Sequence, residues 1–69
     1  MAIDVTGLKS DPSNQGWVLG WAVFRNSPWE LSGMYVDEQE AKRAATDLGD
    51  AYQAAYGSHR VGSDDFMRI

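Results

Sequence analysis

The chain has 69 residues, which suits one domain, and a domain of that length buries only about 60% of the surface that its unfolded chain exposes. With no cysteine and a single histidine, it has neither disulfides nor the usual zinc-ligand sets. Ten acidic and six basic side chains give a formal net charge of −4, which argues against a nucleic-acid partner, because phosphate binding needs clustered positive charge.

The composition is that of a soluble protein. The opening residues, MAIDVTGLKS, lack both a basic start and an apolar run of signal-peptide length. The longest apolar run, Trp17 to Phe24, is far shorter than the roughly 20 residues that cross a bilayer. The absence of cysteine fits a reducing compartment. We therefore expect a soluble, cytoplasmic protein of bacterial or phage origin that has no membrane partner.

The first sixteen residues predict a short strand and a loop. Ile3 and Val5 alternate with Asp4 and Thr6, which is typical of a strand. The following stretch, GLKSDPSNQG, has the composition of turns.

The middle of the chain predicts a β-hairpin. Two β-rich stretches, GWVLGWAVF and WELSGMYV, surround an Asn-Ser-Pro turn. A three-residue loop at 26–28 pairs Val23 with Leu31 and Trp21 with Gly33, whereas a two- or four-residue loop turns the opposite face to the core. We favour the three-residue loop, because a tryptophan opposite Gly33 covers the glycine backbone.

This register gives the hairpin a core face and an outer face. The core face carries Trp17, Leu19, Trp21, Val23, Trp29, Leu31 and Tyr35, and the outer face carries Val18, Ala22, Phe24, Met34 and Val36. A contiguous apolar patch that stays exposed usually marks a protein contact. The alternatives are that terminal segments or a loop cover the outer face, or that it is a dimer surface.

One amphipathic helix is predicted from Glu38 to Tyr56. Asp37 and Glu40 have the spacing of a capping box, and Gly57 stands where a helix commonly ends. Apolar side chains recur at intervals of three and four: Ala41, Ala44, Ala45, Leu48, Ala51, Tyr52, Ala55 and Tyr56. Gly49 would lie inside this helix at a cost of about 1 kcal/mol. The small alanines predict close packing against the tryptophan-bearing hairpin.

The C-terminal stretch DDFMRI predicts a closing edge strand that begins at Phe66. Residues 1–69 are therefore predicted to form a single small α+β domain. Its antiparallel sheet has three or four strands, with one helix packed on one face, in the order β-β-β-α-β or β-β-α-β.

The stretch YGSHRVGSDDF brings the one histidine close to serines and aspartates. His59, Asp64 and Asp65 have donor groups that suit a metal, but their spacing matches no established ligand pattern. Ser58 and His59 are adjacent, so they point apart in an extended chain, and no Gly-x-Ser-x-Gly motif is present. We therefore predict no enzyme, no metal and no cofactor, and expect a turn or the rim of a partner-binding surface.

A three-stranded sheet followed by a helix is similar in outline to the arm-type and AP2-like DNA-binding modules of phage integrases. The resemblance covers the order of elements and the aromatic stretch GWAVFRN, and it implies a sheet that lies in the major groove. The basic strand residues of such modules are reduced here to Arg25. DNA binding is therefore the alternative, not the main prediction.

The main prediction is a non-enzymatic protein-interaction module, an accessory or inhibitory protein that docks its sheet face or a sheet edge on a partner. The predicted partner-binding residues are Val18, Phe24, Arg25, Met34, Val36, His59, Asp64 and Asp65. A structural homodimer is a further alternative, and imitation of the charge of DNA by the acidic side chains is a subsidiary hypothesis. On this prediction, Phe24→Glu or Met34→Glu abolishes docking and leaves the fold intact.

Overall fold

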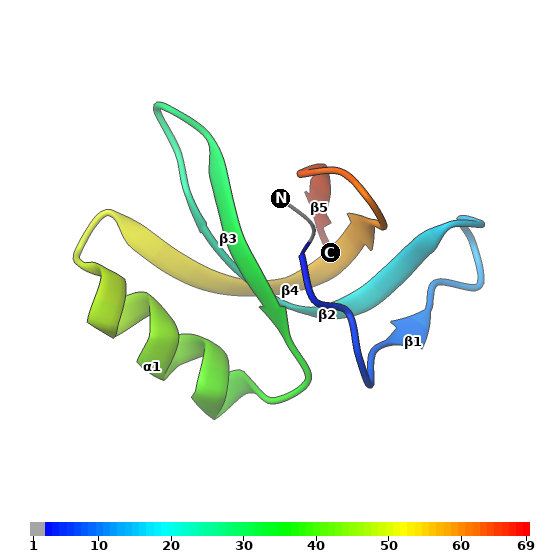
Figure 1. Ribbon diagram of the computed structural model, residues 1–69, viewed down its shortest axis with the longest axis horizontal. Coiled ribbons are helices and arrows are strands. Elements are labelled where there is room, and N and C mark those ends of the chain that lie inside the picture. Colours follow the sequence, from blue (N-terminus) through cyan, green and yellow to red (C-terminus); the bar gives the residue numbers. More distant parts are fainter. Residues whose placement is uncertain (1–2) are drawn as a thin grey trace.

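The computed structural model describes residues 3–69, which form a five-stranded antiparallel sheet and one α-helix (Figure 1). The elements in chain order are β1 (Lys9–Ser10), β2 (Trp17–Arg25), β3 (Glu30–Tyr35), α1 (Glu38–Leu48), β4 (Tyr52–Arg60) and β5 (Phe66–Arg68). The predicted α+β class is confirmed, with one strand more than expected. The predicted strand at residues 3–6 is wrong, because the first strand lies inside the stretch that we expected to be a loop.

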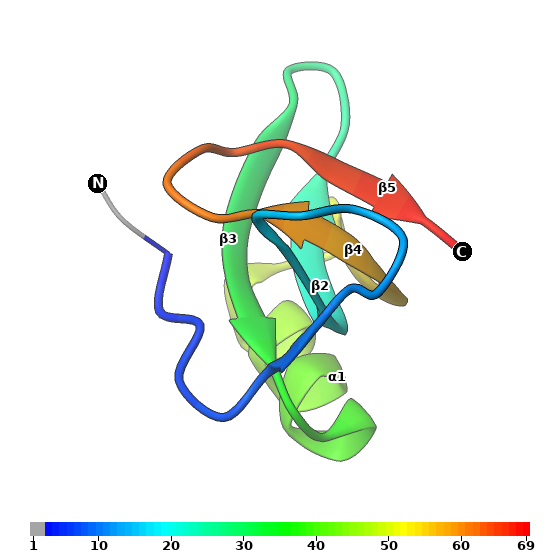
Figure 2. The same cartoon turned by 90° about the vertical axis from the view of Figure 1, so that its right-hand side faces the viewer.

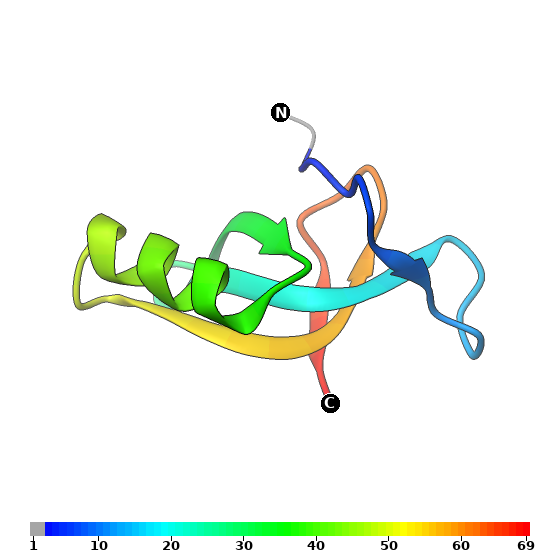
Figure 3. The same cartoon turned by 90° about the horizontal axis from the view of Figure 1, so that it is seen from below.

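The long strand β2 is the centre of the sheet. It pairs along one edge with β4, while β1 and β3 share its other edge, and β5 pairs with the far edge of β4. Figure 3 shows β2 between β3 and β4. Because β3 and β4 are both antiparallel to β2, they run parallel to each other, and α1 connects them.

The helix is shorter than predicted. It begins at Glu38 as expected, although the Asp37 side chain makes no capping hydrogen bond. It ends at Leu48, because Gly49 has a φ of 124°, which favours glycine, and donates its N–H to the Ala45 carbonyl at 3.1 Å. The chain after it is the strand β4. Within residues 3–69, no helix is long and apolar enough to span a bilayer.

One face of the sheet packs against α1. Val23 and Ala41 are fully buried there, with Ala45 beside them, and Trp21 and Tyr35 pack around this cluster. The methyl side chains of the helix let it lie close to the strands. The predicted packing of the alanine face against the tryptophan-bearing strand is therefore confirmed.

The opposite face is buried as well, so the prediction that it is open is wrong. Its cluster consists of Ala22, Phe24, Leu31, Met34 and Ala55, against which Ile3, Leu8 and Phe66 pack. The Trp29 ring lies 5.4 Å from the Phe24 ring, and its Nε1 donates to the Asp64 carbonyl at 2.9 Å. This face is covered by the N-terminal segment, by β5, and by the two loops that contain Trp29 and Asp64.

The register of the hairpin differs from the prediction and changes the face of Leu31. Its loop has four residues, 26–29, and not three, so Arg25 pairs with Glu30. A β-bulge follows, in which Phe24 pairs with Leu31 and Val23 with Gly33, leaving an extra residue in β3. The four-residue loop thus puts Leu31 on the same face as Phe24, whereas the sequence predicted that the helix would cover it, and the extra residue returns Met34 and Tyr35 to their expected faces.

Candidate functional site

The histidine-containing stretch forms the end of β4, a turn and the start of β5. His59 is fully buried, and its Nδ1 lies 2.9 Å from the carbonyl oxygen of Asp65. A carbonyl only accepts hydrogen bonds, so Nδ1 carries the proton, and the buried Nε2 has no hydrogen-bond partner among residues 3–69. The predicted position of His59 on an exposed rim is therefore wrong.

Ser58 and His59 lie on opposite faces of the sheet. Ser58 pairs with Leu19 and His59 with Val18, and successive residues of a strand alternate between faces. The Ser58 hydroxyl instead donates to Oδ2 of Asp11 at 2.7 Å. In the part of the chain that the structure describes, no three histidine or carboxylate side chains gather to hold a metal.

The Ser58–Asp11 hydrogen bond ties the β1–β2 loop to β4. Ser58 is 2% exposed, and a buried hydroxyl that loses its acceptor costs about 1–3 kcal/mol. We therefore expect Asp11→Ala to lower the free energy of unfolding, as measured by urea denaturation. The same substitution should cost less in a Ser58→Ala background, because the hydroxyl is then absent. Equal costs in both backgrounds would contradict this role.

The same pair has an expected pH dependence. Hydrogen bonds from the Asn14 side chain, the Ser13 backbone and the Ser58 hydroxyl hold the pKa of Asp11 below its usual range. A carboxyl whose pKa is lower in the folded state contributes stability above its unfolded pKa and loses it as pH falls through the folded value. The coupling between Asp11 and Ser58 should therefore be full at neutral pH and diminish in acid.

The structure does not gather the predicted partner-binding residues on one open surface. Val18, Phe24, Met34 and His59 are buried, Val36 is exposed, Arg25 lies at the end of the hairpin, and Asp64 and Asp65 lie in the β4–β5 connection. Arg25 Nη2 contacts Glu30 Oε1 at 2.7 Å, and the Tyr52 hydroxyl donates to the same oxygen at 3.0 Å. Only Met34 and Val36 reach the groove described next.

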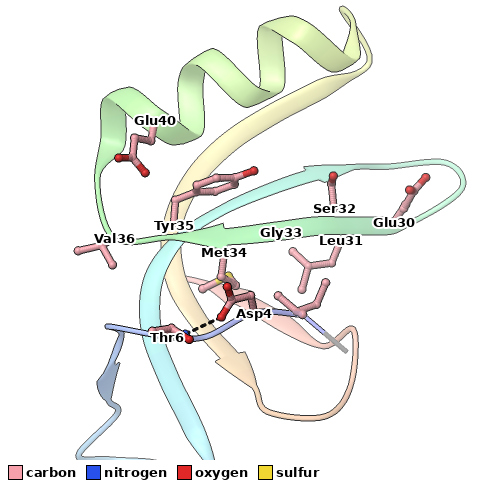
Figure 4. Close-up of a pocket in the computed structure, with 11 residues that line it drawn as sticks. Asp4, Thr6, Glu30, Leu31, Ser32, Gly33, Met34, Tyr35, Val36 and Glu40 are labelled. Atoms are coloured by element: carbon pink, nitrogen blue, oxygen red, sulfur yellow. Dashed lines mark hydrogen bonds between the residues drawn. The ribbon is translucent and has the colours of Figure 1, made fainter. Parts of the chain in front are cut away.

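A groove of about 620 Å³ runs along the outer edge of β3 (Figure 4). β3 forms its floor, the segment of residues 3–6 lies on one side, and Glu40 of α1 lies on the other. Leu31 and Met34 point toward the N-terminal segment, whereas Ser32 and Tyr35 point toward the helix. Asp4 and Thr6 also lie on the side of Leu31 and Met34, so both sides of the groove carry polar groups.

The β3 edge that faces this groove is open. Within residues 3–69, β3 pairs only with β2, so the backbone N–H and C=O groups on its other edge have no strand partner. Figure 2 shows the N-terminal segment beyond that edge, and no backbone hydrogen bond joins the two among the described residues. The Thr6 N–H instead donates to the Asp4 carboxylate at 2.9 Å.

The charged side chains that line the groove are all acidic. They are Asp4, Glu30 and Glu40, and no lysine, arginine or histidine lies among the lining residues. The backbone hydrogen bond from Thr6, followed by its side-chain hydrogen bond, lowers the pKa of Asp4, so this carboxyl is ionised at neutral pH. The sequence does not predict this groove, because no local pattern places residues 3–6 beside β3.

No family model, curated protein or solved structure matches this chain. The geometry of the β3 edge is therefore the basis for the function.

Proposed function

We propose that the protein is a non-enzymatic interaction module that binds a partner protein by pairing the open edge of β3 with an extended segment of that partner. It acts as a cytoplasmic accessory or inhibitory protein. The observation that carries this proposal is a strand edge that opens into a groove and has no strand partner within residues 3–69.

An edge is a better docking site here than a face. The two faces of the sheet are occupied, one by α1 and the other by the cluster around Phe24. An added strand gains main-chain hydrogen bonds from an open edge, and alternate side chains then select the partner. Leu31 and Met34 line one side of the groove but are only 6% and 7% exposed, so main-chain pairing, and not apolar contact, is the basis of docking.

Site-specific photocrosslinking in the source cells tests this proposal. A benzophenone amino acid replaces Ser32, which is exposed and lines the groove, and in a matched variant it replaces Asp47, which is exposed on α1 and does not line the groove. We expect a discrete adduct with another protein from position 32 and not from position 47. Absence of that adduct, or equal adducts from both positions, would contradict edge docking.

The mass of the adduct separates a different partner from a second copy. Pairing of two β3 edges would bring the acidic groups of both copies together, and like charges that face each other across strands are destabilising. We therefore expect a partner other than this chain. An adduct of two copies would indicate the homodimer instead.

A further inference from the structure

We infer that the partner segment is an extended strand that carries basic side chains, an inference that rests on the proposed pairing with β3. Within residues 3–69, the groove combines a strand edge that has no strand partner with the carboxylates of Asp4 and Glu40, and no basic side chain is among its lining residues. Charge complementarity therefore favours lysine or arginine in the strand that occupies it.

The carboxylates of the groove are available to a partner. Glu40 makes no ion pair within residues 3–69. Glu30 is different, because its carboxylate already pairs with Arg25 at 2.7 Å and accepts the Tyr52 hydroxyl at 3.0 Å. Asp4 receives the Thr6 N–H on Oδ1. Among the described residues, Asp4 and Glu40 are therefore the lining carboxylates without an ion pair, and they are the ones available to a basic group.

The two sides of the groove also indicate where the basic side chains lie. A strand paired with β3 directs its side chains alternately to the two sides of the sheet. On one side they meet Asp4, which lies beside the nearly buried Leu31 and Met34, and on the other they meet the region near Glu40 (Figure 4). An alternation of apolar and basic residues gathers its basic side chains on one of these sides, and a carboxylate lies on each.

Three synthetic peptides test this chemistry on the full chain. Each has about eight residues, enough to span β3, and alternates valine with lysine, with serine or with glutamate. Fluorescence anisotropy at low salt gives the affinity, and amide chemical shifts of the labelled protein give the location. We expect the lysine peptide to bind most tightly and to shift the amides of β3 and of residues 3–6.

Charge-neutralising variants provide the matched control. Asp4→Asn with Glu40→Gln removes two charges from the groove, whereas Asp47→Asn with Asp50→Asn removes two exposed charges elsewhere. We expect the first pair to weaken binding of the lysine peptide about threefold to tenfold and the second to leave it nearly unchanged. Equal effects of the two pairs would overturn the inference, because they would show a response to net charge alone.

The peptides also separate this inference from edge docking itself. If the serine or glutamate peptide shifts the amide signals of β3 as strongly as the lysine peptide does, the inference of a basic partner segment is overturned. The proposal that a strand pairs with the β3 edge then still stands. If the lysine peptide shifts only amides outside β3 and residues 3–6, both the edge and its basic partner are overturned.

Discussion

Phe24→Glu is expected to unfold the protein. Phe24 is 5% exposed, lies 5.5 Å from the Phe66 ring and belongs to the cluster that the terminal segments cover. Loss of a buried phenylalanine costs about 3–5 kcal/mol, and an unpaired buried carboxylate adds several more. A domain this small has a total stability near the lower end of about 5–15 kcal/mol. Circular dichroism should show the loss of cooperative thermal unfolding at neutral pH.

Val36→Glu is the matched control for this substitution. It introduces the same charge at a hydrophobic residue that is 62% exposed at the end of β3. We expect it to keep a cooperative transition close to that of the unaltered protein. If Phe24→Glu instead folds with an unchanged Tm, the face around Phe24 is open, as the sequence predicted, and the cluster described above is wrong.

Gly57→Ala is expected to detach β5 from β4. A Cβ at Gly57 would overlap the backbone carbonyl oxygen of Met67 and lie 2.7 Å from Cζ of Phe66. Such overpacking costs about 2–3 kcal/mol, which in a domain of this size lowers Tm by roughly 10–20 °C. Differential scanning calorimetry measures this shift directly.

Gly33→Ala provides the comparison, because the same methyl group would make only ordinary contacts there. The nearest atom to a Cβ at Gly33 is Cε1 of Tyr35 at 3.4 Å, and the position is also in a strand. We expect its Tm to stay the same or rise slightly, since alanine restricts the unfolded chain more than glycine does. Similar losses at both positions would show that strand glycine itself, and not the approach of β5, sets the cost.

The sequence predicted the hairpin strands and the start of the helix because their signals are local. Two β-rich stretches around a Pro-containing turn, and acidic residues before an alanine-rich stretch, each indicate one structure. The end of the helix was wrong because Tyr52 and Tyr56 are compatible with both periods. They are four residues apart, a spacing that puts two side chains on the same side of a helix. The same spacing is an even number, so it also puts them on one face of the strand β4. The helix ends before Tyr52 because Gly49 adopts a positive φ, so both tyrosines belong to the strand.

The faces of the hairpin were not predictable from alternation alone. The four-residue loop puts Leu31 on the face of Phe24, the bulge then returns Met34 and Tyr35 to the faces that alternation predicts, and no residue type in ELSGMY marks that bulge. The cover over this face comes from contacts between distant parts of the chain. The Trp29–Asp64 hydrogen bond joins residues 35 apart in sequence, so it lies beyond any local pattern.

The candidate site was missed for the same reason. The sequence predicts docking by a sheet face or a sheet edge, but the predicted binding residues belong mainly to a face. Hydrophobic side chains can be read from a sequence, whereas backbone groups without a strand partner cannot. An unpaired strand edge can be identified only when the order of the strands in the sheet is known. Asp4 and Glu40 lie in separate predicted elements, and only the fold brings them to the same groove.

The central position of β2 distinguishes the most firmly held part of this sheet from the open edge of β3. β2 has neighbours on both edges, so its hydrogen bonds break only when the sheet as a whole opens. The outer edge of β3 belongs to no such pairing within the described residues. Substitutions along that edge can therefore change its surface without breaking the pairing of β2 with its neighbours.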